Sequence, residues 1–370
     1  MNERGKKVFV GMSGGVDSAV SAALLKEQGY DVTGVFLQVW QPDFLTCTRG
    51  DDRQEAMRAA AHIGIPFITM DVEREYKEAV VEYMISEYAK GRTPNPDVMC
   101  NKHVKFGVFY DKAMGMGADY VATGHYARVI EELVSDAPEK RHVRYSLRRG
   151  KDTNKDQSYF LWTLTSDKLA HILFPVGEYE KPRVRERARK FGLPNAERKD
   201  SQGVCFMGQF SMEDFLKHYI EPKRGEVLNE AGEVIGWHEG AAFFTLGKRH
   251  GFTITKKTPD DAPYYVVAKD MKRNAITVAH EAAEAGFAVN EVVLEQVNVV
   301  SGEALEDGFA CMAQVRYRGT PVACRVFVAD HTTVRVVFDT PQEAVAAGQS
   351  VVLYGGEVCL GGGVIARTIC

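Results

Sequence analysis

The chain has 370 residues, of which 45% are hydrophobic and 26% are charged, a composition typical of a globular protein with two or three domains. Because 50 Asp and Glu residues outnumber 46 Lys and Arg residues, a nucleic-acid partner would have to bind local basic patches. No run approaches the roughly twenty consecutive apolar residues of a membrane span, and the apolar run before Ser13 is too short for a signal peptide. We therefore expect a cytoplasmic protein that does not contact a membrane.

The cysteine pattern bears on metal binding. Seven cysteines are present, and they include no Cys-x-x-Cys pair. This pattern indicates a reducing compartment and argues against a zinc ribbon or an iron–sulfur cluster. We predict no metal-ligating residues.

The first motif is an apolar strand that breaks into glycines and restarts as a helix over residues 19–26. Such a turn presents backbone N–H groups and the positive end of a helix dipole at one point, which favours a phosphate. The glycines let the backbone approach an anion closely, and the serines add hydroxyl donors. The predicted phosphate-binding residues are Gly11, Met12, Ser13, Gly14, Gly15, Val16, Asp17 and Ser18.

This loop is not a Walker loop, because no Gly-Lys-Ser/Thr follows, and it lacks the spaced glycines of the dinucleotide fingerprint. Its Ser-Gly-Gly-x-Asp-Ser pattern resembles the PP-loop ATP pyrophosphatases, which split ATP between the α and β phosphates. The alternative is a plain left-handed turn capped by Ser13 or Asp17.

Strands and helices alternate through the first part of the chain. We expect strands over residues 31–40, 66–72 and 119–123, and helices over 51–63, 73–90 and 104–114. This order predicts an α/β fold with a doubly wound parallel sheet, whose ligands lie at the carboxyl ends of the strands. The glycine loop lies at such an end, as do Leu37 and the pair Gly124-His125.

Two basic segments follow this sheet. Residues 127–150 predict a hairpin with a polar tip over 135–140, and residues 140–156 contain seven Lys or Arg against two Asp. The mostly helical stretch 181–199 has eight Lys or Arg against two Glu. Together they indicate a positive face, or else two ordinary solvated faces.

The rest of the chain is rich in strands. Short strands between Gly, Asp and Asn turns predict a small β-rich domain, and from about residue 288 longer strands at 311–318, 322–328, 334–338 and 350–354 predict a closed antiparallel barrel. We therefore expect three domains, comprising residues 1–215, 216–287 and 288–370.

Two thiols lie in unusual settings. Cys100 follows two prolines and leads into a helix that we expect to start at Val104, so the helix dipole and the nearby Lys102 and Lys105 should lower its pKa. Cys205 lies in a glycine turn after the basic helices. A single cysteine in such a setting would fit a buried core residue equally well. Two of them in an ATP-activating scaffold favour sulfur chemistry.

These motifs together resemble the bacterial tRNA 2-thiouridylases, and the resemblance extends from the first strand to the last ten residues. It rests on the glycine loop, 93–97 with Cys100-Asn101, 122–126, 155–160, 200–206, 316–318, 341–342, 348–349 and 355–363. Gln202 and the stretch 247–251 depart from the family pattern but keep the turn glycines.

The resemblance implies a reaction. ATP, with Mg²⁺ shielding its phosphates, would bind the glycine loop, Leu37 and Gly124 and adenylate the C2 oxygen of the wobble uridine in tRNAs for Lys, Glu and Gln. Cys205 would carry sulfur as a persulfide, and Cys100 would release it, leaving a Cys100–Cys205 disulfide. A cysteine desulfurase or a sulfur-relay carrier protein would supply the sulfur.

The resemblance also implies where the anticodon stem-loop binds. Asp97 would handle the proton and, with Asn95 and Pro96, hold the flipped base. His125 would lie near the anticodon, although it could instead support the ATP site. The other implied tRNA contacts are Lys155, Asp156, Gln157, Arg316, Tyr317 and Gln349.

Two other functions fit parts of this pattern. A PP-loop ligase would adenylate a carbonyl for a nitrogen nucleophile, and it would not need two loop thiols. A non-catalytic tRNA-binding sulfur carrier would not need the glycine loop. A further thiol, Cys47, lies in a loop after the second strand and is either another sulfur-handling group or incidental.

Overall fold

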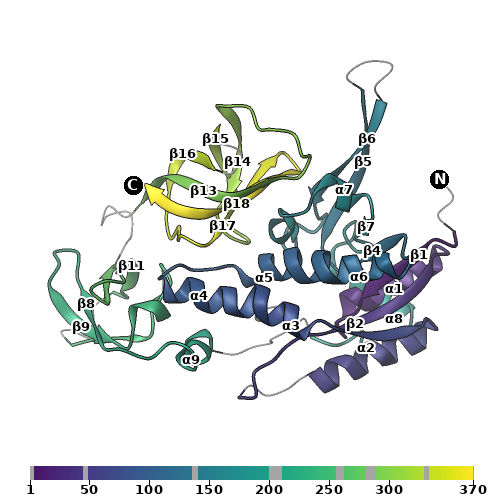
Figure 1. Cartoon of the computed structure of the whole chain (residues 1–370), viewed down its shortest axis with the longest axis horizontal. Coiled ribbons are helices and arrows are strands. Elements are labelled where there is room, and N and C mark those ends of the chain that lie inside the picture. Colours follow the sequence, from purple (N-terminus) through teal and green to yellow (C-terminus); the bar gives the residue numbers. More distant parts are fainter. Residues whose placement is uncertain are drawn as a thin grey trace.

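The computed structural model describes residues 4–44, 49–135, 141–199, 211–255, 262–280, 288–328 and 333–369. Three sheets organise these residues (Figure 1). The parallel sheet lies at the right of the view, a barrel lies above the centre, and a smaller sheet, here called the central sheet, lies at the left. The expectation of a mixed α/β chain that ends in a barrel is confirmed.

The parallel sheet has the order β3-β2-β1-β4-β7, and all its neighbouring strands run parallel. Its strands are β1 (Lys7–Gly11), β2 (Asp31–Gln38), β3 (Phe67–Asp71), β4 (Tyr120–Ala122) and β7 (Ile172–Leu173). Successive side chains of a strand point to opposite faces. Val8 and Val10 therefore pack in one core cluster and Phe9 in the other, and both faces of the sheet are covered.

Different helices cover the two faces. The cluster around Val8 includes residues of α1 (Val16–Glu27), α2 (Arg49–Ile63) and α8 (Lys181–Lys190). The cluster around Phe9 includes two long helical stretches. One runs through α3 (Glu73–Tyr76), η1 (Lys77–Glu82) and α4 (Tyr83–Ala89), and the other through α5 (Pro96–Met99), η2 (Cys100–Phe109) and α6 (Tyr110–Gly115).

The second stretch begins earlier than predicted. Asn95 accepts a hydrogen bond from Val98 N at 3.2 Å and Pro96 occupies the first helical position, so the helix starts eight residues before Val104. An N-cap Asn followed by Pro is a helix-start signal that the sequence analysis did not use. Cys100 consequently lies in the second turn of the helix rather than ahead of it.

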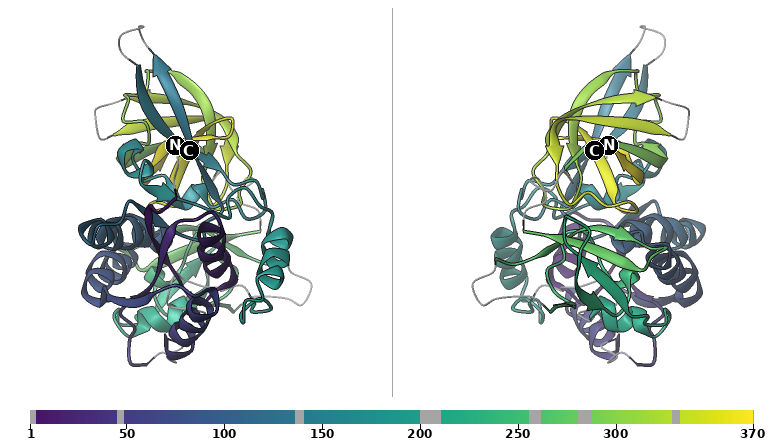
Figure 2. Two further views of the ribbon diagram at one scale, coloured as in Figure 1. Left: turned by 90° about the vertical axis from the view of Figure 1, so that its right-hand side faces the viewer. Right: turned by 90° about the vertical axis from the view of Figure 1, so that its left-hand side faces the viewer.

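The predicted hairpin over 127–150 is present as β5 (Ala127–Ser135) and β6 (Arg141–Arg149). Its partner was not predicted: β6 pairs with β18 (Val358–Ile369), with Leu147 opposite Cys359. Figure 2 shows the hairpin beside the barrel strands. Three short elements follow it, η3 (Ser158–Leu161), α7 (Ser166–Leu169) and β7.

The barrel is closed, as predicted, because β13 (Val289–Val299) pairs with both β16 (Val334–Gln342) and β18. Its other strands are β14 (Phe309–Gln314), β15 (Val322–Val328) and β17 (Ser350–Gly355). The strand predicted over 311–318 is shorter than expected. It ends at Gln314, and Arg318 adopts a left-handed φ of 59° in the turn that follows.

The central sheet has the order β10-β9-β8-β12-β11. Its strands are β8 (Gly225–Leu228), β9 (Val234–His238), β10 (Phe252–Ile254), β11 (Tyr265–Asp270) and β12 (Ala275–Ala279), accompanied by α9 (Met212–Lys217) and η4 (Ala241–Phe243). Among the residues that the structure describes, none of the helices is long and apolar enough to cross a membrane.

Candidate functional site

The glycine loop connects β1 to α1 at the carboxyl end of the parallel sheet. Met12 N donates to Val35 O at 2.8 Å, and Gly14 has a φ of 78°, a backbone conformation that glycine adopts without strain. The N-cap of α1 is Gly15, so the alternative of a turn capped by Ser13 or Asp17 is wrong. The first turn of α1 therefore starts at a residue that has no capping side chain.

Ser18 organises this loop from inside. Its hydroxyl accepts a hydrogen bond from Ser13 N at 3.3 Å and donates to Gly15 O at 3.2 Å, and the residue is 5% exposed. We expected this hydroxyl to face an anion. In this conformation it holds the loop backbone instead.

Two residues that the sequence analysis did not single out close the loop from behind. Asn195 Nδ2 donates to Gly14 O at 2.9 Å and to Gly15 O at 3.2 Å, and Arg198 Nη1 donates to Gly14 O at 3.2 Å. Arg198 also pairs with Asp52. A Cβ on Gly14 would lie 2.5 Å from Asp52 O, so no larger residue fits. The signal was visible in the sequence, because Arg198 belongs to the basic stretch 181–199 that we assigned to a positive face.

Asp17 is held by two partners at the start of α1. Tyr126 Oη donates to its Oδ1 at 2.8 Å, and Lys181 Nζ donates to the same oxygen at 2.7 Å. Gly124 lies directly against this turn, since a Cβ there would be 2.7 Å from Ser18 N. The structure therefore brings Gly124 and the glycine loop together, as the pattern predicts.

The side chains of three other predicted ligand-binding residues point into the core. Met12, Val16 and Leu37 are 2%, 4% and 5% exposed. Met12 packs against the space above Gly34, where a Cβ would lie 2.6 Å from the Met12 sulfur. The side chains of these residues are therefore not available to a ligand in this conformation.

The first turn of the α5–η2 helix forms a second polar region. Asp97 lies partly exposed in that turn, next to the cap made by Asn95. Cys100 is fully buried one turn later, and the side chain of the next residue, Asn101, donates to Phe160 O at 3.1 Å. Cys47 and Cys205 lie outside the described residues, so the predicted partnership of Cys100 with Cys205 stays a prediction.

The barrel holds the segment that leads into this helix. Gln349 Nε2 donates to Thr93 O at 2.9 Å and to Pro94 O at 3.1 Å, and Thr93 N donates to Ala347 O at 2.8 Å. A Cβ on Gly348 would lie 2.9 Å from Thr93 O. The resemblance assigns Gln349 to tRNA binding, but in this structure its amide nitrogen donates to backbone carbonyls of the chain itself.

Two further predicted tRNA contacts are in the turn after β14. The ring of Tyr317 packs on Phe160, with centroids 4.5 Å apart, whereas Arg316 is exposed. The structure thus places Tyr317 at the junction of barrel and helical region. Arg316 remains available to a partner.

Two of the residues predicted near the anticodon, Asp156 and Gln157, make contacts within the chain, whereas Lys155 is partly exposed. Asp156 is buried and accepts hydrogen bonds from Arg149, from Gly150 N and from Ser158. Gln157 Oε1 accepts from Tyr126 N at 3.0 Å.

His125 is 7% exposed between Thr123 and Lys105. Burial, together with the Lys105 ammonium, holds the pKa of His125 well below its usual value. This placement favours the alternative in which His125 supports the ATP site from behind.

The predicted positive face is partly neutralised within the chain. Arginines of the two basic segments pair with nearby carboxylates in Arg144–Glu303, Arg148–Glu132, Arg149–Asp156, Arg183–Glu186 and Arg189–Glu197. The Arg149–Asp156 pair is largely buried, whereas the more exposed pairs contribute little stability and dissociate readily for a polyanion. Those exposed pairs keep their arginines available to a ligand.

The acidic side chains near the loop are few. Within the described ranges, no group of three or more His, Cys, Asp or Glu residues is placed to hold a metal ion. Asp17 is paired with Lys181, and Asp52 with Arg198. Magnesium commonly binds through one or two carboxylates plus substrate phosphates. This donor set fits an ion that arrives with a nucleotide and contacts Asp17, not a dedicated metal cage.

Family models match three consecutive parts of the chain. They are described as a tRNA methyl transferase HUP domain over residues 6–209, a tRNA methyl transferase PRC-barrel domain over 213–280 and an aminomethyltransferase beta-barrel domain over 289–365. A solved 4-thiouridine synthetase in complex with RNA and ATP is 17% identical and covers 58% of this chain and 50% of its own, with a TM-score of 0.36. A structural similarity at this level does not show a shared function.

Curated relatives match nearly the whole chain. The tRNA-specific 2-thiouridylase MnmA of Listeria monocytogenes is 44% identical over 97% of this chain and 94% of its own length. The protein of the same name from Haemophilus ducreyi is 43% identical over 98% and 94%. Identity of this extent covers the glycine loop, the helix of Cys100 and the barrel together. The chain belongs to the family of tRNA-specific 2-thiouridylases.

Proposed function

We propose that the chain catalyses ATP-dependent 2-thiolation of the wobble uridine in tRNAs for Lys, Glu and Gln. The observation that carries this proposal is the glycine loop, whose α1 start has no capping side chain and lies against Gly124, in a chain 44% identical to a 2-thiouridylase. The family membership names the reaction, and the loop supplies the anion site that the reaction requires.

The first half-reaction activates the uridine. The phosphates of ATP lie against the loop backbone and the first turn of α1, where N–H groups and the helix dipole favour negative charge. A magnesium ion that arrived with the nucleotide would be held by Asp17 together with the phosphates, and it would supply charge neutralisation for the pyrophosphate. The C2 oxygen of the base attacks the α-phosphate, and Lys181 holds Asp17 in place at the start of α1. The resulting AMP ester makes the C2 oxygen a good leaving group.

The second half-reaction replaces oxygen with sulfur. The terminal sulfur of a Cys205 persulfide attacks C2, and AMP leaves with the oxygen. The Cys100 thiolate then attacks the inner sulfur of Cys205, which breaks the S–S bond to the transferred sulfur and forms a Cys100–Cys205 disulfide. An external reductant restores both thiols, and a cysteine desulfurase or a relay carrier reloads Cys205.

The burial of Cys100 adds a requirement to this scheme. A thiolate that is to react must be accessible, and Cys100 has no exposed surface in this conformation. The first turn of its helix contains the partly exposed Asp97, so binding of the flipped base at Asn95, Pro96 and Asp97 is the event that opens a path to the thiol. Asp97 transfers the proton during substitution.

The internal contacts sort the predicted tRNA residues into two groups. Lys155 and Arg316 have exposed surface and contact the RNA backbone. His125, Asp156, Gln157 and Gln349 position the surrounding chain instead. Tyr317 links the two groups through its packing on Phe160.

Mass spectrometry of nucleosides tests this proposal directly. Unmodified tRNA incubated with the protein, ATP, magnesium and a sulfur source should yield 2-thiouridine at the wobble position. Asp17→Ala should abolish both thiolation and tRNA-dependent ATP–pyrophosphate exchange, whereas Cys205→Ser should abolish thiolation and keep the exchange. Asp31→Ala, at an exposed position of β2, is the matched control and should behave as wild type.

Two outcomes would overturn it. Full thiolation by Cys205→Ser would mean that Cys205 does not carry the sulfur, whereas ATP–pyrophosphate exchange by the wild-type protein without any 2-thiouridine would favour the ligase that uses a nitrogen nucleophile. Unchanged thiolation by Asp17→Ala would mean that ATP chemistry is not performed at this loop.

A further inference from the structure

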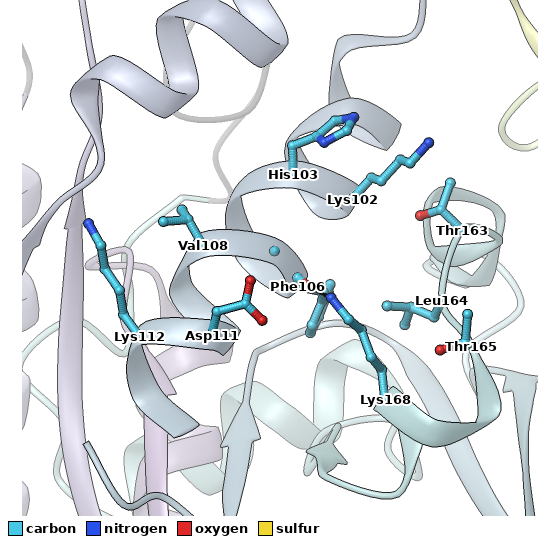
Figure 3. A pocket seen from close by; sticks show the side chains of 11 residues that line it. Lys102, His103, Phe106, Val108, Asp111, Lys112, Thr163, Leu164, Thr165 and Lys168 are labelled. Carbon is cyan, nitrogen blue, oxygen red and sulfur yellow. Dashed lines mark hydrogen bonds between the residues drawn. The ribbon is translucent and has the colours of Figure 1, made fainter. Parts of the chain in front are cut away.

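A groove of about 480 Å³ lies on the outer side of the helix that contains Cys100. One wall is the η2–α6 stretch, with Lys102, His103, Phe106 and Asp111 (Figure 3). The opposite wall is the segment 163–165 together with Lys168 of α7. None of these residues takes part in the ATP site described above.

The helix irregularity in this wall fixes one of the lysines. Gly107 has φ −104° and ψ −106°, which is not helical, and the surrounding turns are π-helical. Such a break releases a backbone carbonyl from the regular ladder. Lys168 Nζ donates to Phe106 O at 2.5 Å and lies 5.1 Å from the centre of the Tyr110 ring. An ammonium group has three donors, so the bond to Phe106 O leaves two others.

Charged side chains are spread along the groove. Figure 3 shows Lys102 and His103 at the upper end, whereas Asp111 and Lys112 lie at the lower end. Lys112 is engaged by Asp71 O at 2.9 Å and by Glu75 at 3.5 Å. Burial, with the nearby Lys102 and Lys168 ammoniums, lowers the pKa of His103. An anion is therefore attracted by Lys102 at the upper end and by Lys168, which lies lower in the view, and is repelled by Asp111.

A hydroxyl group in the wall lacks a partner. Thr163 Oγ1 is buried and makes no hydrogen bond to any residue that the structure describes. A buried hydroxyl without a partner costs about 1–3 kcal/mol, and an oxygen atom of a bound anion would satisfy it. Thr165, exposed on the same wall, offers a second hydroxyl.

We propose that this groove binds a backbone phosphate of the substrate RNA, two or so nucleotides from the base held at Asp97. The inference rests on the proposed function for the identity of the RNA. Lys102 follows Asp97 by five residues on one helical stretch, which corresponds to about 7.5 Å at 1.5 Å per residue. A nucleotide advances a strand by about 3.4 Å in a duplex, so a strand that presents its base at Asp97 can reach the groove.

Salt-dependent binding of a fluorescent anticodon stem-loop tests the groove without requiring turnover. Lys102→Gln and Lys102→Glu should weaken binding, by about 3-fold and about 10-fold, and each should lower the slope of log Kd against log salt by about 0.7 to 0.9. The KM for ATP should stay unchanged. Lys272→Gln, at an exposed turn between β11 and β12, is the matched control and should keep the wild-type slope.

The outcomes separate the groove from the proposed function and from a small-anion site. Wild-type affinity and slope in both Lys102 variants would overturn the groove as an RNA site. Unchanged RNA binding with weaker inhibition by inorganic phosphate or pyrophosphate would identify a small-anion site and also overturn it. Failure of the wild-type chain to bind the stem-loop would instead contradict the proposed function.

Discussion

The glycine loop and the segment that leads to Cys100 are assembled in opposite ways. The loop is held by the region that forms the parallel sheet and its helices, through contacts with Val35, Asp52, Gly124, Tyr126, Lys181, Asn195 and Arg198. The Cys100 segment depends on the barrel, more than 250 residues later in the chain. The proposed nucleotide site therefore depends on one region of the chain, whereas the proposed sulfur site depends on two.

Arg92 strengthens this dependence on the barrel. Its Nε lies 2.7 Å from Glu87 of α4, while Nη2 donates to Ile365 O at 3.2 Å and to Glu295 at 2.5 Å. Residues 92–94 are thus fixed to β13, to β18 and to the turn that contains Gln349. The barrel therefore positions the segment that leads into the helix start at Asn95, in addition to any contact that it makes with RNA.

Disrupting the loop should have the largest effect. In Gly124→Ala, the new methyl group would lie 2.7 Å from Ser18 N and 2.9 Å from the Asp17 carbonyl carbon, both backbone atoms that cannot rotate away. The start of α1 has to move, and we expect ATP affinity to fall about 100-fold, or about 2.7 kcal/mol. Isothermal titration with ATP measures this change.

The matched control is Gly115→Ala. A Cβ on Gly115 meets nothing within 4 Å, and this residue ends α6 without a left-handed φ. Gly115→Ala should bind ATP as wild type does. Equal ATP affinity in the two variants would mean that the contact between Gly124 and α1 does not shape the nucleotide site.

Breaking the barrel contact should have a smaller and more selective effect. Gln349→Ala removes two donors from the Thr93 and Pro94 carbonyls, each worth about 0.5–1.5 kcal/mol. We expect thiolation to fall about 10-fold through kcat, with the ATP Kd and the RNA Kd unchanged. Single-turnover thiolation and RNA titration separate these quantities.

Gln342→Ala is the control for this variant, because among the residues that the structure describes the Gln342 amide donates to Thr340 and Pro341 of its own strand. It should leave thiolation unchanged. A loss of RNA affinity in Gln349→Ala, with kcat preserved, would return Gln349 to the role of a direct tRNA contact.

The same contrast explains what could be predicted from the sequence. The loop was found because its function depends on residues adjacent in the chain: a strand, glycines at 14 and 15, and a helix start. The parallel sheet followed from alternation of local patterns, and the barrel from several strands with turns between them. Each of these features can be recognised from residues that are close together in the sequence.

The features that were missed depend on contacts between distant segments. Asn195 and Arg198 meet Gly14 across about 180 residues, and β6 joins β18 across more than 200. The sequence alone does not indicate whether a basic side chain donates to a backbone carbonyl or stays exposed to bind a ligand. The misplaced helix start at Asn95 is different, since Asn-Pro was a local signal that could have been used.

His125 lies between the two regions and provides the smallest predicted effect. Its Nδ1 lies 2.7 Å from Thr123 Oγ1, after β4, and Lys105 Nζ lies 3.3 Å from its Nε2. An ammonium group can only donate, so Nε2 accepts and the proton is on Nδ1. Burial in the core is the main reason why the pKa of His125 is low in the folded state, and the Lys105 ammonium, which a second proton at Nε2 would face, lowers it further.

The sign of the pH effect follows from linkage. Below the unfolded pKa of about 6.5, the unfolded chain binds a proton at His125 that the folded chain does not, so acid lowers the free energy of unfolding. Between pH 7.5 and pH 5.5, wild type should lose about 1 kcal/mol more than His125→Gln in urea unfolding. Lys105→Met removes the second cause and keeps the first, burial, so its loss should lie between the two. If wild type and His125→Gln lose the same free energy over this range, the imidazole accepts its proton in the folded state and does not join the two regions as a neutral group.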